Sequence, residues 1–110
     1  ISRYHKQPGG DLVWNVGTGY FGCGQGSDKR VFDPAMFKEN ATLSQVKMIE
    51  IKLSQGAKPA HGGMLPAAKI TPVIAEARGL AGPPYTDCNS PATHSAFDSC
   101  EGLMNFVAQL

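Results

Sequence analysis

The sequence lacks an excess of charge, a long apolar run and a fixed repeat. Ten Lys and Arg against nine Asp and Glu leave a formal net charge of +1, so composition implies no polybasic surface for nucleic acid or an anionic membrane. No stretch approaches the ~18 apolar residues of a membrane span, and no basic-then-apolar signal segment opens the chain as given. For 110 residues we therefore expect one small globular domain, or part of a larger one.

Cysteine is scarce and its spacing matches no metal-binding or disulfide pattern. Cys23, Cys88 and Cys100 are odd in number, form no CxxC pair and have no His at metal-finger spacing, which argues against a structural zinc site. We expect the ordinary reduced thiols of a cytoplasmic protein. The alternative, a nucleophilic thiol, falls on Cys100, in the expected first turn of a helix where a thiolate is stabilised.

The hydrophobic pattern predicts buried strands that alternate with short helices. Strands are expected at residues 12–16 and 46–53, and helices at 34–40 and 72–78. A third helix is expected to begin at a capping box formed by Asp98 and Glu101. One face of this last helix is apolar and is formed by Leu103, Met104, Phe106, Val107 and Leu110. Four segments are expected to be irregular, at residues 1–10, 22–30, 54–68 and 80–97. The segment at 22–30 is expected to be a flexible surface loop. Alternating strands and helices favour a parallel α/β fold.

The strand at 46–53 carries two charged residues in an otherwise apolar run. Such runs are typical of parallel strands covered on both faces. Period two places Glu50 and Lys52 on one face. Because a lone buried charge costs several kcal/mol, that face must be polar, paired or lined by a ligand.

Ligand sites in β/α folds lie at the carboxyl ends of the strands. Lys52, Gln55 and Lys58 crowd the end of the 46–53 strand, and Gly56 and Gly62-Gly63 would let backbone amides approach an anion. An equally weighted alternative is a solvated loop whose Gly and Pro only shape the turn. The glycines match neither GxGxxG nor the phosphate-binding P-loop, so a nucleotide motif is not supported.

Longer motifs add a family resemblance. The run EIKLSQGAKPAHGGMLPAAKITPVIAEARG at residues 50–79, followed by SPATHSAF at 90–97, resembles the FMN-binding central domain of glutamate synthase, especially the short glutamate synthase-like proteins. GGDLVWNVGTGYFGC at 9–23 resembles the preceding strand and glycine turn of that family. The resemblance implies a partial (β/α)8 TIM barrel, about three of the eight β/α units, with residues 1–110 an internal fragment of one FMN-binding domain.

The same resemblance implies an activity and its partners. An FMN-dependent oxidoreductase would reduce 2-iminoglutarate, formed from 2-oxoglutarate and ammonia, to L-glutamate. Its electrons would come from NAD(P)H or ferredoxin, and the full-length protein could hold an iron–sulfur cluster, for which this segment has no ligands. The fragment alone is expected to be inactive. The alternative is a non-catalytic anion- or flavin-binding module derived from the same barrel.

Site residues follow from the match to the family motif. Lys58 is implied to be catalytic, and the substrate is implied to bind Lys58, Gln55 and Arg78. The cofactor is implied to border Lys52, Gln55, Asn15, Gly17, Thr18 and Gly19, and no metal ligand is implied. For His94 we expect a hydrogen-bonded scaffold residue, with proton donation as the alternative.

Three positions depart from the common family pattern. Ala60 stands where the family commonly has Gly, so a Cβ restricts that turn. His61 and Met64 stand where the large enzymes usually have Glu and Gln, and a Met side chain cannot donate the amide hydrogen bonds. The short family members share the last two departures.

Overall fold

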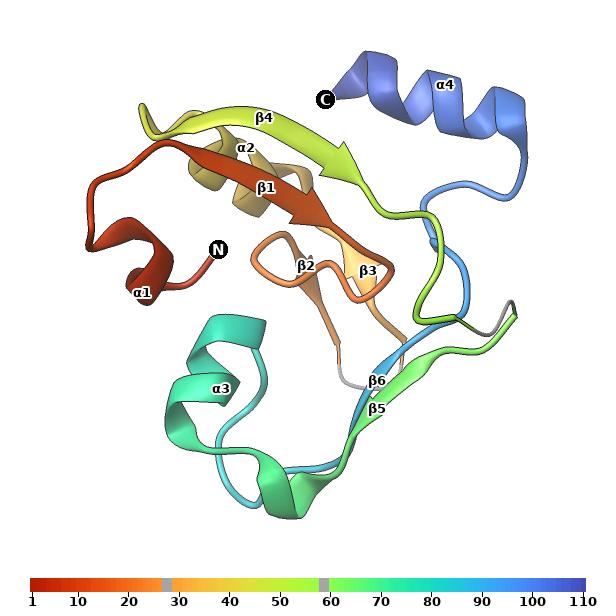
Figure 1. The fold of residues 1–110 in the computed structure, drawn as a ribbon. Helices are drawn as coiled ribbons and strands as arrows, with labels where there is room; N and C mark the ends of the chain where they lie inside the picture. The colour runs from red at the N-terminus through yellow and green to blue at the C-terminus, as the bar shows by residue number, and fades with distance from the viewer. Residues whose placement is uncertain (27–28, 58–59) are drawn as a thin grey trace.

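The computed structural model describes residues 1–26, 29–57 and 60–110. Its central element is a parallel pair of strands, β1 (Leu12–Val16) and β4 (Val46–Ile51). Helix α2 (Pro34–Ala41) lies behind the pair in Figure 1. The predicted strand, helix and strand thus form one β/α/β unit, which confirms a mixed α/β fold with parallel strands in one small sheet.

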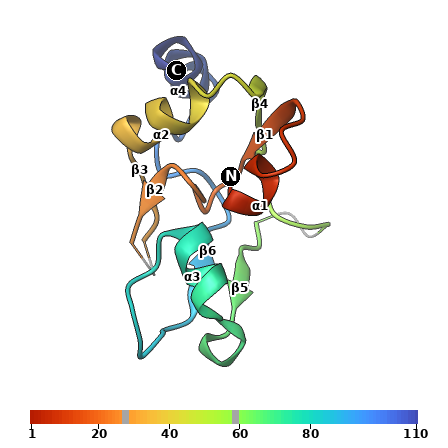
Figure 2. The ribbon, with the colours of Figure 1, turned by 90° about the vertical axis from the view of Figure 1, so that its left-hand side faces the viewer.

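Two short antiparallel ladders complete the strands of the described residues. They pair β2 (Gly24–Gln25) with β3 (Val31–Phe32), and β5 (Gly63–Leu65) with β6 (Cys88–Ser90). The remaining elements are α1 (Arg3–Lys6), a 3₁₀ turn η1 (Ala67–Lys69), α3 (Pro72–Arg78) and α4 (Cys100–Gln109). Figure 2 shows α2 and α4 at one end of the molecule and α3, β5 and β6 at the other. No helix in the described part is long and apolar enough to cross a membrane.

Helix boundaries follow local capping chemistry. Asp33 caps α2 by accepting from the amides of Ala35 and Met36 at 2.9 and 3.1 Å. Gly79 closes α3 in the left-handed conformation with φ of 66°. Both boundaries confirm the sequence prediction. The predicted cap of α4 is wrong by one residue, because Ser99 rather than Asp98 accepts from the Gly102 amide, at 3.0 Å.

The segments predicted to be irregular contain most of the short elements, so that prediction is wrong where these elements lie. The flexible surface loop predicted at 22–30 is wrong for its described residues, 22–26 and 29–30. Cys23, Gly24 and Arg30 are buried there, and β2 pairs with β3. The segments 54–68 and 80–97 pair with each other through β5 and β6, and 1–10 contains α1. Since this pairing joins segments far apart in the chain, local periodicity could not signal it. The predicted strand 46–53 ends earlier, at Ile51.

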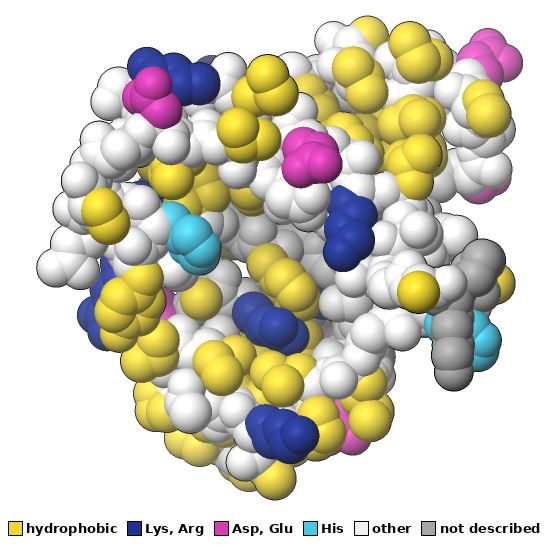
Figure 3. All heavy atoms as spheres, viewed as in Figure 1, with side chains coloured by type: hydrophobic (Ala, Val, Ile, Leu, Met, Phe, Trp, Pro, Cys, Tyr) yellow, Lys and Arg dark blue, Asp and Glu magenta, His cyan; other side chains and the backbone are white. Residues whose placement is uncertain are grey.

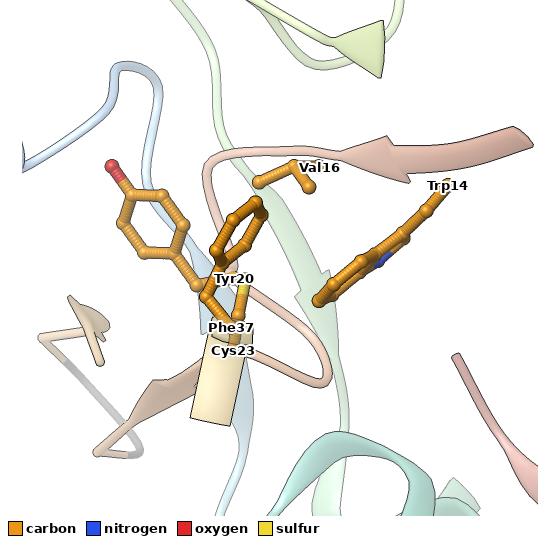
Figure 4. Packing of buried hydrophobic residues seen from close by; sticks show 5 residues of the cluster. All are labelled: Trp14, Val16, Tyr20, Cys23 and Phe37. Carbon is orange, nitrogen blue, oxygen red and sulfur yellow. The ribbon is translucent and has the colours of Figure 1, made fainter. Parts of the chain in front are cut away.

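The main core lies between β1 and α2. Figure 4 shows its five buried members, Trp14 and Val16 of β1, Phe37 of α2, and Tyr20 and Cys23 of the intervening turn. The Trp14 and Phe37 rings stack with centroids 5.3 Å apart. A second cluster consists of Ile70, Ala75 of α3 and Cys88 of β6. Trp14 is therefore a core residue.

The opposite face of β1 and β4 is open. The register pairs Val13 with Met48 and Asn15 with Glu50, and Val13 and Met48 are 59% and 62% exposed. Figure 3 shows apolar and charged side chains together over these strands. The prediction that β4 is covered on both faces is wrong here. Glu50 is exposed on this face and accepts a 3.0 Å hydrogen bond from Nδ2 of Asn15, so the face is polar and paired, two of the three alternatives that the sequence left open.

Helix α4 covers little of the molecule with its apolar face. Of the five residues predicted on that face, only Phe106 is buried; its ring packs edge-on against Phe32 with centroids 4.9 Å apart. Met104, Val107 and Leu110 are exposed. These three residues of the predicted apolar face are therefore not buried by the described part of the chain.

Candidate functional site

The turn after β1 and the segment after β4 meet at one edge of the parallel pair. The amide of Lys52 donates to the carbonyl of Val16 at 2.9 Å, which continues the ladder beyond Ile51. Residues 17–20 and 52–55 therefore start from adjacent strand ends. This is the position where β/α folds bind ligands.

A buried hydroxyl connects these segments to the loop after β6. Gln55 donates from Nε2 to Oγ1 of Thr18 at 2.9 Å, and Thr18 donates to the carbonyl of Pro91 at 2.6 Å. Thr18 is fully buried and Gln55 is half-buried. The structure thus brings together Thr18 and Gln55, both of which the family motif implies to border the cofactor. It adds Pro91, which was not among the predicted site residues.

His94 makes a second connection to the same edge. Its Nε2 lies 2.7 Å from the carbonyl of Lys52, and its Nδ1 lies 2.9 Å from the hydroxyl of Tyr20. The Ala96 amide donates to that hydroxyl at 3.2 Å. Burial lowers the pKa of His94 and raises that of Tyr20. Both rings are therefore neutral near pH 7, and the contacts support the scaffold interpretation of His94.

Arg30 holds the glycine turn in place, a role that the sequence analysis missed. Only 1% of its surface is exposed. The guanidinium donates to the carbonyls of Gly19 at 2.6 Å, Gly24 at 3.3 Å and Arg78 at 2.8 Å, and also to that of Gly26. Desolvation lowers the pKa of Arg30. A lone Arg in a Gly-rich segment carried no signal for this, because its partners are backbone carbonyls.

Arg78, predicted to clamp a substrate carboxylate, packs against the interior. Its guanidinium carbon lies 4.2 Å from the centroid of the Phe21 ring, and its Nη1 lies 3.9 Å from Sγ of Cys88. Arg30 approaches the same ring at 5.5 Å. Phe21 is thus half-buried beside two cations, and the structure does not bring Arg78 into contact with Gln55.

Glycines at this edge are required by close packing. A Cβ on Gly19 would lie 2.8 Å from Oγ of Ser90, and one on Gly62 would overlap the Ser90 carbonyl oxygen. A Cβ on Gly17 would lie 3.2 Å from Nε2 of Gln55. Ala60 has a φ of 60°, a left-handed conformation that favours Gly. Ala60 thus adopts a left-handed conformation at the turn that its Cβ is expected to restrict, where the family commonly has Gly.

The other predicted site residues lie on the surface or outside the described part. The side chains of Lys52 and Asn15 are exposed, Asn15 on the open face of β1. Lys58 lies outside the described residues. Cys100, the candidate nucleophile, is exposed at the start of α4, whereas Cys23 and Cys88 are buried and all three thiols are free. Within residues 1–26, 29–57 and 60–110 no three His, Cys, Asp or Glu side chains gather as metal ligands do.

Chemically, the edge offers an exposed ammonium from Lys52, an amide from Gln55 and a closely packed glycine turn. A cation of this kind recognises electron-rich ring edges, carboxylates and phosphates, and an amide pairs with a polar group of a ligand. The fold and the site together define a β/α segment whose strand ends carry candidate ligand-binding residues. Sequence comparison gives its family: a model described as the conserved region in glutamate synthase matches residues 1–110, and the chain belongs to that family.

Individual relatives agree with this family. The chain is 30% identical over 110 residues to a glutamate synthase large subunit-like protein of Bacillus subtilis, over 100% of this chain and 20% of that protein. It is 36% identical over 104 residues to an archaeal-type glutamate synthase [NADPH] of Thermotoga maritima, over 84% of this chain and 20% of the relative. It is also 41% identical over 68 residues to a ferredoxin-dependent glutamate synthase of Antithamnion sp., over 62% of this chain and 4% of that protein.

The chain spans a fifth or less of the length of these relatives. No solved structure matches it.

Proposed function

We propose that residues 1–110 belong to the FMN-binding barrel of a glutamate synthase that reduces 2-iminoglutarate, formed from 2-oxoglutarate and ammonia, to L-glutamate. The observation that carries the proposal is the adjacency of the glycine turn at 17–20 and the β4 exit at 52–55. Both segments contain the family motif, and both lie at the carboxyl edge of parallel strands. The open face of β1 and β4 would be covered by the remaining strands and side chains of the barrel.

The residues at this edge fit a flavin. A planar ring with an electron-rich edge needs a cation, an amide and closely approaching backbone, and Lys52, Gln55 and the Gly17–Gly19 turn offer these groups. When bound, reduced FMN supplies a hydride to the imine carbon. Lys52 and Gln55 would hold the ring, and Lys58, from its match to the motif, would hold a carboxylate of the keto acid and act in catalysis.

The electron donor is part of the proposal. Relatives carry the names NADPH and ferredoxin-dependent glutamate synthase, so we infer one of these two donors, reached through a cofactor bound elsewhere in the full-length protein. We also infer a cytoplasmic location, which the free thiols of Cys23, Cys88 and Cys100 support. Arg78 remains a candidate for a substrate carboxylate only if ligand binding draws it away from Phe21.

The test uses the full-length protein that carries this segment. Purified protein should show the yellow flavin spectrum or take up added FMN, and 2-oxoglutarate with ammonium should reoxidise its reduced flavin. Replacing Lys52 by Met should weaken FMN binding about tenfold or more, since a charged hydrogen bond contributes roughly 1.5–3 kcal/mol. Lys47→Met, an exposed change near the start of β4 and away from the strand end, is the control.

A colourless protein that takes up no FMN would contradict the proposal. FMN binding without any reoxidation by 2-oxoglutarate and ammonium would instead favour the non-catalytic flavin-binding module. Lys58→Ala should slow that reoxidation without releasing the flavin.

A further inference from the structure

The hydrogen bonds around Thr18 determine which way the amide of Gln55 faces. Thr18 has one hydroxyl proton, and the carbonyl of Pro91, which can only accept, takes it at 2.6 Å. The remaining lone pairs of Oγ1 can only accept. The group of Gln55 that lies 2.9 Å away must therefore be the NH₂, because the carbonyl oxygen would meet an acceptor without a proton.

The carbonyl oxygen Oε1 of Gln55 is consequently turned away from Thr18. Gln55 is half-buried, whereas Thr18 is fully buried beneath it. Within the described ranges 1–26, 29–57 and 60–110, no donor is recorded at Oε1. This leaves an acceptor with a fixed orientation at the edge where the strands end. A ligand there gains a hydrogen bond from Gln55 only if it presents a proton.

We infer that Thr18 is a positioning residue that fixes Gln55 Oε1 as an acceptor, and that the ligand meets it with a ring N–H, the imide N3–H of the flavin. The inference rests on the proposed function, in which the ring is FMN. An oxidised isoalloxazine carries a single ring N–H, at N3, between two carbonyl oxygens that can only accept. The family motif predicts that Thr18 itself borders the cofactor, but its hydroxyl is fully buried and already used twice.

The experiment compares FMN with 3-methyl-FMN, which lacks that proton, by equilibrium titration of the full-length apoprotein. The wild type should bind FMN about tenfold more tightly than 3-methyl-FMN, since a net hydrogen bond of about 1.4 kcal/mol corresponds to tenfold. Thr18→Val, of similar shape but without the hydroxyl, should reduce this ratio toward one. Thr18→Ser, which keeps the hydroxyl, should preserve the ratio.

The ratio distinguishes positioning from a general structural effect. If Thr18 were only structural, Thr18→Val would weaken the binding of both flavins equally, and that outcome would overturn the inference. If 3-methyl-FMN bound weakly only because its methyl group clashes with the protein, that clash would persist in Thr18→Val. The ratio of the two affinities would then be the same in the variant as in the wild type, which would also overturn the inference. Equal binding of the two flavins by the wild type would also overturn it.

A second variant covers the case in which Thr18→Val does not fold. Gln55→Met removes the amide and leaves Thr18 bonded to Pro91, and it should also bring the ratio toward one; a retained tenfold ratio would overturn the inference. If no protein binds either flavin, the proposed function fails and the inference fails with it. If FMN binds but the ratio is one in the wild type, the proposed function stands and only the inference fails.

Discussion

His94 donates a hydrogen bond from Nε2 to the carbonyl of Lys52 at 2.7 Å, which fixes the tautomer of the imidazole. Because a carbonyl can only accept, Nε2 carries the proton, and Nδ1 accepts from the Tyr20 hydroxyl at 2.9 Å. Only a neutral ring satisfies both contacts in this way. The contact ties the loop at 91–97 to the exit of β4.

We expect the stability of this connection to depend on pH. Burial lowers the pKa of His94 below its ordinary 6.5 in the folded state, so the unfolded chain binds a proton more readily. The contribution of neutral His94 to the free energy of unfolding is therefore complete above about pH 6.5. It is lost as the pH falls below that value, by at most about 1.4 kcal/mol per pH unit. Urea unfolding midpoints between pH 5 and 8 measure it.

The matched variant is His94→Gln, whose amide can donate to Lys52 and accept from Tyr20 without titrating. The difference in midpoint between the wild type and this variant should change as the pH falls below 6.5. Parallel pH profiles for the two proteins would show that His94 does not titrate with unfolding.

Arg30 should dominate the local stability of the glycine turn. Arg30→Met would leave the carbonyls of Gly19, Gly24 and Arg78 buried without a donor. Since an unsatisfied buried group costs about 1–3 kcal/mol, we expect hydrogen exchange in residues 17–26 to accelerate about thirtyfold or more. Mass spectrometry of that peptide checks this. Arg3→Met, an exposed change, should leave the exchange rates of this peptide unaltered.

Two neighbouring glycines should respond differently to the same substitution. A Cβ on Gly62 would overlap the backbone oxygen of Ser90, whereas one on Gly63 would lie 3.8 Å from the Ser90 Cβ, an ordinary contact. We expect Gly62→Ala to destabilise the protein by roughly 1–3 kcal/mol and Gly63→Ala to change its stability by less than about 0.5 kcal/mol. Thermal unfolding of the two variants compares them. Equal effects would mean that the contact with Ser90 does not set the requirement for glycine.

The cysteines should differ sharply in reactivity. Cys100 is exposed, whereas Cys23 is buried and desolvation raises its pKa to about 12. Because the thiolate is the reactive form, iodoacetamide at pH 8 should modify Cys100 at least about a hundredfold faster than Cys23 in the native protein. Peptide mass spectrometry measures both rates, and 8 M urea should remove the difference. Rapid native modification of Cys23 would contradict its burial.

The sequence predicted the parts of this chain that depend on neighbouring residues. The strands predicted at 12–16 and 46–53 follow from short apolar runs, although the second ends at Ile51. Helices α2 and α3 follow from Asp33-Pro34, Thr71-Pro72 and Gly79, whose capping chemistry is local. The long motif from Glu50 to Gly79 also carried the family, which comparison confirms. The position of Gln55 beyond a strand end followed from the same pattern, whereas Lys52, predicted inside the strand, lies just after it.

Tertiary structure alone decided how the edge is held together. Thr18 meets Pro91 across 73 residues, and His94 meets Lys52 across 42. The partners of Thr18, His94 and Arg30 at these contacts are backbone carbonyls, which every residue type supplies, so no side-chain pattern in the sequence can indicate them. For the same reason the hairpin of β2 and β3, and the scaffold contacts of His94, became visible only once the chain was folded.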